Sequence, residues 1–208
     1  MAGGAGPDIY IVDNPGDVVF ELDEPGMSDV VCASVSFVLP DFVERPRLEG
    51  GDAIDGTGND LANGIYGNDA ANLLIGATGD DTLGGGGGVD TLAGGTGHDR
   101  IRGGAGADLF LLDVAPGDGV ELILDFETGL DRLGFAALVF PWLGSLGQLA
   151  DELFDAGSAA TTAEHRILHD AATRMLSFDA DGSGAAGPVA IALVRASAPL
   201  SAADLWVV

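Results

Sequence analysis

Four aspartates recur at intervals of nine residues in the middle of the chain: Asp81, Asp90, Asp99 and Asp108. Each follows a glycine-rich stretch and comes two residues before a large apolar residue. A carboxylate at the end of a turn, next to free backbone carbonyl groups, offers an all-oxygen ligand set, which is the set that Ca²⁺ prefers. The spacing therefore predicts a row of oxygen-ligated cation sites.

The aspartates belong to six consecutive nine-residue units that run from Gly58 to Leu111 without an insertion. The eighth residue of every unit is apolar, and the sixth is Asp or Asn. The last three units follow the pattern G-G-x-G-x-D-x-U-x in full, where U is a large apolar residue, and a seventh full match stands alone at residues 3–11. A flexible glycine-rich linker would not keep an apolar residue at every ninth position, so we expect folded structure.

Each unit predicts a short strand, such as Asp90 to Leu92, followed by a glycine-rich turn in which positive φ is easily adopted. Strands and turns then wind into a flattened parallel coil with two units per rung and rungs about 4.8 Å apart. Units n and n+2 stack, which places Asp81 over Asp99 and Asp90 over Asp108. Carboxylates about 5 Å apart repel by roughly 3 kcal/mol at an effective dielectric constant near 20, so the stack needs a cation between its members.

These units resemble the RTX, or haemolysin-type, calcium-binding repeat, whose family folds as a parallel β-roll. The resemblance implies that Ca²⁺ lies between successive turns on the same side, bound by the position-six aspartates and by carbonyl groups of the glycine turns. One implied site joins the turns of Asp81 and Asp99, and another joins those of Asp90 and Asp108. The implied carbonyl ligands are Gly79, Gly86, Gly88, Gly95, Gly97, Gly104 and Gly106. Asn63 and Asn72 stand where the family has Asp, so we expect sites that use them to be weaker or absent.

Composition excludes several classes of function. The 208 residues include 34 glycines, and 33 acidic residues against 8 basic ones give a net charge of −25. Such a chain repels phosphate backbones and anionic lipids, so we expect no nucleic-acid partner and no stable membrane insertion. Hydrophobic residues make up 47%, which excludes a disordered acidic tail. The single cysteine, Cys32, cannot form an intramolecular disulfide.

The segments before the repeats read as β-structure. Alternating or β-branched runs predict strands at Asp17–Leu22, Val30–Leu39 and Phe42–Leu48. Pro46 lies inside the last of these, so we expect that strand to be irregular or at a sheet edge. The isolated repeat at residues 3–11 is similar to the exit from an earlier β-roll.

The segment after Leu111 resembles the closing segment of the roll in serralysin-type exoproteins. Asp118 and Asp125 in it are candidates either for additional Ca²⁺ ligands or for turn caps. An apolar face and a capping box formed by Ser145 and Gln148 predict a helix at Ser145–Ala156, which we expect to cover the open end of the roll.

The tail of the chain reads again as strands, at Arg166–His169, Arg174–Phe178 and Pro188–Arg195. Residues 179–184, between the last two, have oxygen-bearing side chains in alternation, but position twelve of an EF-hand would be Ala190. We therefore expect a long hairpin turn there, with a lone weak Ca²⁺ site as the alternative.

The final residues, Leu200–Val208, combine an acidic residue with terminal apolar ones. They are similar to the uncleaved export signal of substrates of the type I (ABC transporter) secretion apparatus. Residues 1–12 show no signal peptide, because they lack a basic start and a long apolar run. The resemblance implies a secreted, extracellular protein.

No catalytic constellation can be assembled from the sequence. His165 and His169 are spaced i, i+4 but have no Glu between them, so the zinc protease motif H-E-x-x-H is absent. The glycines at 84–88 lack the Lys of a phosphate-binding loop. We therefore expect a protein that is not an enzyme.

Together these observations predict an all-β fold, a parallel β-roll (β-solenoid) with flanking β segments and a carboxy-terminal β cap containing one short helix. The predicted division is 1–57 for the amino-terminal segment, 58–112 for the β-roll and 113–208 for the cap. The favoured function is a secreted, non-catalytic calcium-binding module whose folding is driven by Ca²⁺. Two alternatives stay open: a carbohydrate- or surface-binding module in which outward-facing Arg100 and Arg102 contact an anionic polysaccharide, and the export and folding portion of a larger secreted hydrolase.

Overall fold

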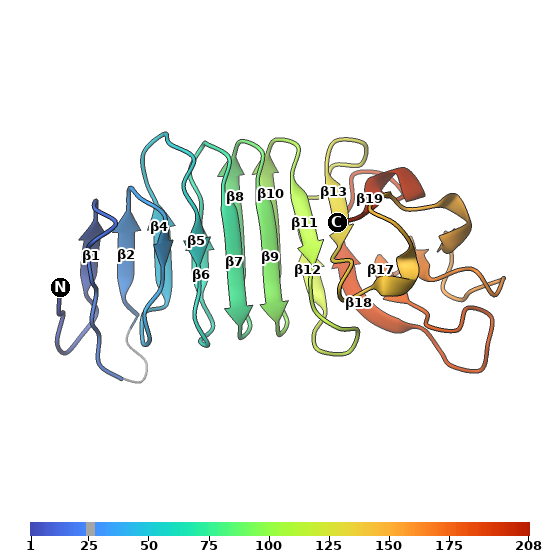
Figure 1. The fold of residues 1–208 in the computed structure, drawn as a ribbon, viewed down its shortest axis with the longest axis horizontal. Coiled ribbons are helices and arrows are strands. Elements are labelled where there is room, and N and C mark those ends of the chain that lie inside the picture. The colour runs from blue at the N-terminus through green and yellow to red at the C-terminus, as the bar shows by residue number, and fades with distance from the viewer. Residues whose placement is uncertain (24–27) are drawn as a thin grey trace.

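The computed structural model describes residues 1–23 and 28–208, and over these residues the protein consists of two facing β-sheets (Figure 1). One sheet has 11 strands in the order β1-β2-β4-β6-β8-β10-β12-β18-β17-β16-β15, and the other has 8 in the order β14-β19-β13-β11-β9-β7-β5-β3, as counted within the described residues. The strands are β1 Ile9–Val12, β2 Val30–Ala33, β3 Phe37–Val38, β4 Arg45–Leu48, β5 Gly56–Thr57, β6 Gly64–Tyr66, β7 Leu73–Thr78, β8 Thr82–Gly87, β9 Thr91–Thr96, β10 Arg100–Ala105, β11 Leu109–Leu112, β12 Glu121–Ile123, β13 Arg132–Phe135, β14 Gly147–Gln148, β15 Phe154–Asp155, β16 Ile167–Asp170, β17 Met175–Phe178, β18 Val189–Val194 and β19 Leu205–Val207.

Successive strands from β3 to β13 alternate between the two sheets, so the chain winds as a coil with one strand of each sheet in every turn. Over this stretch, neighbouring strands within a sheet are parallel, as in the pairs Leu83↔Ile101 of β8 and β10 and Leu74↔Leu92 of β7 and β9. Partners lie eighteen residues apart, which confirms that units n and n+2 stack. The predicted all-β parallel β-roll is therefore the observed fold.

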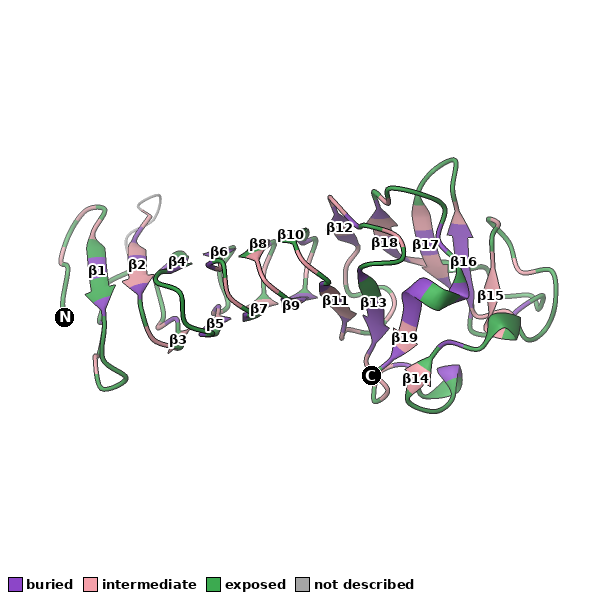
Figure 2. Cartoon of the chain, turned by 90° about the horizontal axis from the view of Figure 1, so that it is seen from above, coloured by how far each residue is buried: buried purple, intermediate pink, exposed green. Residues whose placement is uncertain are grey.

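The core is a double row of apolar side chains between the sheets, which Figure 2 shows as buried segments along the length of the roll. The position-eight residues of all six units are at most 1% exposed: Ile65, Leu74, Leu83, Leu92, Ile101 and Phe110. Ile123 continues the row on one sheet, and Leu133 and Leu205 continue it on the other. Each unit contributes a single large core residue, so only stacking produces a continuous core.

The amino-terminal strands differ in part from the prediction. Asp17–Leu22 is not a strand; Phe20 alone makes an isolated bridge, to Ala2. Pro46 is buried in β4, which lies between β2 and β6 and so is not an edge strand. Because Pro46 has no N–H to donate, the pairing of β4 with β6 is reduced to the single pair Arg47↔Tyr66, which is the irregularity that the proline predicted.

The predicted helix at Ser145–Ala156 is wrong. This segment holds β14, a 3₁₀ turn at Asp151–Leu153 and β15, and Leu146 of the supposed apolar face is 72% exposed. The helices of the described residues are three 3₁₀ turns, at Pro141–Leu143, Asp151–Leu153 and Ala202–Asp204. Pairing of β14 with β19 satisfies the backbone at Gly147 and Gln148, and this tertiary contact overrides the helical pattern.

The carboxy-terminal strands were predicted correctly. β16, β17 and β18 form an antiparallel group that extends the 11-stranded sheet, and the turn at residues 179–184 connects β17 to β18 as a hairpin. The final strand β19 lies between β13 and β14, with Leu205 and Val207 at most 1% exposed. The terminal apolar residues are thus part of the core of the cap.

Candidate metal centre

The position-six aspartates of the last four units lie in two stacked pairs, and their side chains are between 0% and 2% exposed. The backbone N–H of Asp81 donates to Oδ1 of Asp99 at 2.7 Å. The backbone N–H of Asp90 donates to Oδ1 of Asp108 at 2.9 Å. These bonds hold each carboxylate against the turn two units earlier, which is the stacking that the spacing predicted.

The second carboxylate oxygen of each aspartate has no hydrogen-bond partner. Oδ2 of Asp81, Asp90, Asp99 and Asp108 is fully buried and unpaired, as judged over residues 1–23 and 28–208. An unpaired buried carboxylate oxygen destabilises the folded state, because the charged group loses its hydration and gains no hydrogen bond in the protein. Two such oxygens stacked on each side of the roll need either protons or a cation.

Backbone carbonyl groups converge on the same space. A Cβ atom placed on Gly76 would lie 2.3 Å from Oδ2 of Asp81 and 2.3 Å from the carbonyl oxygen of Gly94. On the other side, a Cβ on Gly85 would lie 2.2 Å from Oδ2 of Asp90 and 2.5 Å from the carbonyl oxygen of Gly103. The first glycine of a unit therefore leaves open a cradle lined by a carboxylate oxygen and by a carbonyl oxygen of the turn two units on.

Burial and mutual repulsion raise the pKa values of these carboxyl groups. Burial, reinforced by the charge of Asp99, raises the pKa of Asp81 to about 7. Burial, reinforced by the charge of Asp108, raises the pKa of Asp90 to about 6. Burial also raises the pKa values of Asp99 and Asp108, against the hydrogen bonds from the backbone of Asp81 and Asp90. Each stacked row of carboxylates, one that contains Asp81 and Asp99 and one that contains Asp90 and Asp108, is called an acidic ladder below. Without a cation, an acidic ladder is poorly suited to carry its negative charge at neutral pH.

The glycines at the second and fourth positions of the last four units have a conformational role. Gly79, Gly86, Gly88, Gly95, Gly97, Gly104 and Gly106 all have φ between +90° and +149°. Ala77 occupies the same slot with φ +82°, which is strained for a residue with a Cβ. Carbonyl oxygens of the neighbouring turn also leave no room for a side chain at these glycines. A Cβ on Gly97, for example, would lie 2.1 Å from the carbonyl oxygen of Gly79. The ligand role that the sequence assigned to their carbonyl groups stays a prediction.

In the two units that have asparagine at position six, the side-chain amide groups form hydrogen bonds within the protein. Nδ2 of Asn72 donates to the carbonyl oxygen of Ile54 at 2.6 Å and to Oδ1 of Asn68 at 3.2 Å. Nδ2 of Asn63 bonds in the same way to Val43 and Asn59. The amide group supplies donors where an aspartate has only acceptors, which supports the expectation that sites using Asn63 and Asn72 are weaker or absent.

Comparison with known families agrees with this geometry. Residues 52–113 match the RTX calcium-binding nonapeptide repeat (four copies), in overlapping matches at 52–92, 66–101 and 84–113. This segment is an RTX calcium-binding β-roll. No curated protein matches the chain significantly.

The RTX repeat family binds Ca²⁺, and the donors present here fit that ion. The unpaired oxygens of the aspartates and the carbonyl groups of Gly94 and Gly103 form an all-oxygen set without sulfur or imidazole. When bound, Ca²⁺ supplies positive charge that neutralises these buried carboxylates. The position-one carbonyl groups escaped sequence reasoning, because only the stacked turns bring them beside the carboxylates.

The acidic ladder continues beyond the RTX segment at both ends. Asp131 follows Asp108 in register, and Glu121 follows Asp99. In the other direction Asp8, Asp29 and Glu44 are linked in the same manner, by bonds of 2.8 Å from the Asp8 N–H to Asp29 and of 2.9 Å from the Asp29 N–H to Glu44. The sequence pattern singled out none of these five as a ligand, although G-x-D or G-x-E before an apolar pair marks two of them, Asp8 and Glu121.

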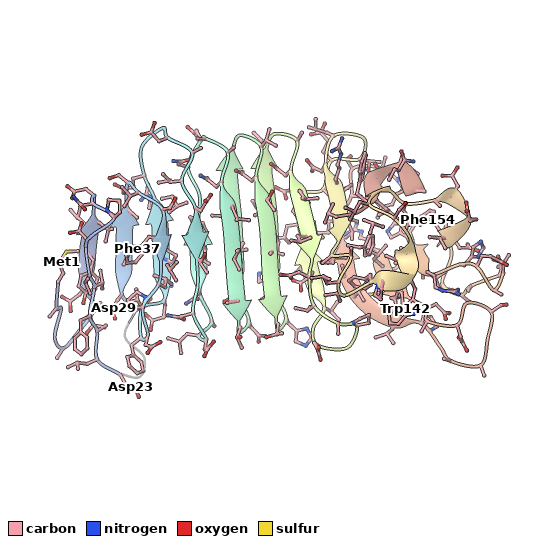
Figure 3. The ribbon with its side chains drawn as sticks, viewed as in Figure 1. Met1, Asp23, Asp29, Phe37, Trp142 and Phe154 are labelled. Carbon is pink, nitrogen blue, oxygen red and sulfur yellow. The ribbon has the colours of Figure 1, made fainter. Side chains whose placement is uncertain are left out.

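The amino-terminal end of this ladder brings together three carboxylates. Ligand oxygens of Asp8, Glu21 and Asp29 lie within 4.8 Å of one another, and the Tyr10 hydroxyl donates to Glu21. Figure 3 labels Asp29 at this end of the roll. The hydrogen bond to Tyr10 lowers the pKa of Glu21, so this carboxylate is stabilised within the protein.

The two candidate ligands of the closing segment lie elsewhere. Asp125 accepts hydrogen bonds from the N–H groups of Gly103 and Gly104, at 3.0 and 3.2 Å, and lies 3.6 Å from Arg102. Asp118 is exposed, and its carbonyl group accepts the N–H of Gly97. Asp125 thus makes the contacts of a turn cap, and a metal-binding role for either residue remains a prediction.

Proposed function

We propose that this chain is a secreted, non-catalytic calcium-binding module whose folding is driven by Ca²⁺ bound between its stacked turns. The observation that carries the proposal is the row of buried, unpaired Oδ2 atoms at Asp81, Asp90, Asp99 and Asp108. Because ionised carboxylates in this row repel one another, metal-binding free energy becomes folding free energy. The residues that hold the ion are these aspartates and the carbonyl groups of the glycine turns.

The proposed switch follows from calcium concentration. Extracellular calcium modules bind with dissociation constants of roughly 10⁻⁴ to 10⁻³ M, so their sites stay empty at cytosolic calcium levels. The ladder then remains unfolded, which is the form that a type I secretion apparatus can export. Outside the cell, calcium fills the sites and the roll folds.

The position of the terminal segment supports export before folding. Leu205 and Val207 are buried in β19, between β13 and β14, so a receptor can reach this segment only while the cap is unfolded. Among the described residues, no helix has the length and apolar character needed to cross a membrane. Exchanging Leu205 for Asp should reduce both export and folding of the cap, whereas the exposed Ala203 should tolerate replacement by Ser.

The surroundings of the histidines support a non-catalytic role. Asp155 lies 2.9 Å from Nδ1 of His165, and the hydroxyl of Thr161 lies 3.3 Å from the same nitrogen. In a nucleophilic triad the imidazole lies between the two partners and uses both of its nitrogens. Here both partners approach one nitrogen, so the cluster lacks that geometry.

Calorimetric titration with Ca²⁺, followed in parallel by far-UV circular dichroism, tests the proposal. We expect several ions to bind per chain and the strand signal to appear with binding at neutral pH. A strand signal that EGTA leaves unchanged, together with no heat of calcium binding, would refute the switch.

A second candidate function has a specific observation in its favour. Tyr66 lies exposed on the outer face of β6, with Arg45 and Arg47 on β4 to one side and Arg100 and Arg102 on β10 to the other. These residues line two adjoining surface depressions that share Tyr66. An aromatic ring flanked by guanidinium groups suits an acidic polysaccharide, whose sugar rings stack and whose carboxylates pair with Arg.

A pull-down on immobilised alginate distinguishes the two candidates. If the second function holds, the wild-type protein with Ca²⁺ binds, and the double variant Arg100→Ala/Arg102→Ala loses binding while keeping its calcium stoichiometry. Equal retention of both proteins would show that Arg100 and Arg102 do not bind the polysaccharide, and the second function would then lose its support. The neighbouring coding sequence tests the remaining alternative, in which the module serves the export and folding of a larger secreted hydrolase.

A further inference from the structure

The segment at residues 119–123 forms a further rung of the roll although it lies outside the RTX match. Gly119 bridges to Gly97, and β12 continues the sheet after β10 with the pairs Arg100↔Leu122 and Ile101↔Ile123. This register places Glu121 opposite Asp99, at the structural position that aspartate holds in a repeat. The spacing from Gly97 to Gly119 is twenty-two residues instead of eighteen, so a nonapeptide pattern does not find it.

Glu121 lies in the ladder, and one of its carboxylate oxygens has no hydrogen-bond partner among the described residues. The residue is 3% exposed, and its Oε2 has no hydrogen-bond donor, as judged for the residues that the structure describes. Oδ2 of Asp99, the residue opposite Glu121 in the sheet register, is likewise buried and unpaired among the described residues. Two acceptor-only groups therefore face each other out of contact with water.

At Gly94 no carbonyl oxygen of a later turn is among the three nearest atoms, unlike at Gly76 and Gly85. A Cβ atom placed on Gly76 or Gly85 would lie 2.3 or 2.5 Å from the carbonyl oxygen of a later turn. For a Cβ placed on Gly94, the three nearest atoms, out to 2.8 Å, all belong to Asp99. Glu121 brings a carboxylate oxygen to this end of the ladder.

At the end of the other ladder, the carboxylate of Asp131 has hydrogen-bond donors from the protein at both of its oxygens. Asp131 stands in register below Asp108, and its Oδ1 accepts the N–H of Asp108 at 3.0 Å. Its Oδ2 accepts the N–H of Glu127 at 2.7 Å. Both oxygens of Asp131 thus have protein donors, whereas Oε2 of Glu121 has none.

We propose that Glu121 is a Ca²⁺ ligand and, together with Asp99, forms an additional calcium site that closes one side of the roll beyond the RTX segment. This site rests on the proposed calcium-binding function and extends it to a residue that no repeat motif contains. The ligand class is a hard divalent cation, because both side chains offer only oxygen.

Equilibrium dialysis of the full chain with ⁴⁵Ca²⁺ at neutral pH tests the proposal. Glu121→Gln keeps the shape of the side chain and removes its charge, and we expect it to bind one ion fewer per chain than the wild type. Asp131→Asn makes the same chemical change at the end of the other ladder and should keep the wild-type count. Far-UV circular dichroism at saturating Ca²⁺ establishes that each variant is folded.

The outcomes separate this inference from the proposed function. If the wild type binds Ca²⁺ and Glu121→Gln binds the same number with the same affinity, the site is wrong while the function stands. If the wild type binds no Ca²⁺, the proposed function itself fails. Should Glu121→Gln not fold, Glu121→Asp replaces it: we expect a full count with one site weakened at least tenfold, and a titration that superimposes on the wild type would overturn the site.

Discussion

Oδ1 of Asp99 accepts the backbone N–H of Asp81 at 2.7 Å, whereas Oδ2 of the same carboxylate is buried and has no partner among the described residues. The hydrogen bond fixes the direction of the side chain, and the free oxygen faces the space between the turns. One carboxylate thus serves both the stacking of rungs and the binding of a cation. Loss of the charge removes only the second role, because an asparagine can still accept the hydrogen bond, and this separates the effects of the following variants.

Asp90→Asn should weaken calcium binding between the turns of Asp90 and Asp108 at least tenfold. The amide keeps an oxygen for hydrogen bonding and adds donors, as Asn72 does one rung earlier in the same ladder: its Oδ1 accepts the N–H of Asn68, and its Nδ2 donates to the carbonyl oxygen of Ile54. Calorimetric titration measures the change. Asp69→Asn, which removes the same charge from an exposed position, is the control, and an equal loss of affinity in that variant would show that net charge rather than ligation is responsible.

Stability of the calcium-free protein should fall as the pH rises. Burial raises the pKa of Asp81 to about 7, of Asp90 to about 6 and of Glu121 to about 9, all above the values near 4 of an unfolded chain. A group with a raised pKa keeps its proton longer in the folded state, so this stability is complete below about pH 4 and is lost as the pH rises through the folded values.

Thermal unfolding in EGTA checks this pH dependence. We expect cooperative unfolding of a folded protein in EGTA at about pH 5 and little folded protein in EGTA at about pH 7.5, and saturating Ca²⁺ should restore folding at the higher pH. The double variant Asp81→Asn/Asp90→Asn should show a flatter profile in EGTA. A calcium-free midpoint that increases between these two pH values would contradict the assignment.

Ala77→Gly should stabilise the folded roll by about 0.5–1 kcal/mol, because Ala77 adopts φ +82° where the later units have glycine. Chemical denaturation at saturating Ca²⁺ measures the difference in free energy of unfolding. Ala62→Gly, at an exposed position without positive φ, serves as the control and should instead lose stability. Destabilisation by Ala77→Gly would show that the strain at this residue is unimportant.

Phe110→Ala should destabilise the protein by about 3–5 kcal/mol. Phe110 is fully buried at position eight of the last unit, and its ring centroid lies 5.8 Å from that of Phe126. The cavity would interrupt the core where the roll meets the cap. Denaturation with calcium present measures the loss, and Leu138→Ala, at a 99% exposed side chain, should change stability by less than about 0.5 kcal/mol.

The repeat was sufficient to predict the β-roll, because every unit encodes the same local structure. An apolar residue at each eighth position and glycines at the positions with positive φ leave a single way to bury the core, which is to stack units n and n+2. The pairing of Asp81 with Asp99 follows from that stacking alone. Local and tertiary preferences agree throughout this part of the chain.

Only the tertiary structure decided what happens outside the repeat. Residues 145–156 carry a helical pattern, yet strand pairing with β19 holds Gln148 extended. Glu121 and Asp131 join the ladder through sheet pairing across insertions that no fixed period describes. Sequence by itself determined the repeating unit and its ligand chemistry, since both are local; the ends of the ladder depend on contacts between distant segments, and these exist only once the chain is folded.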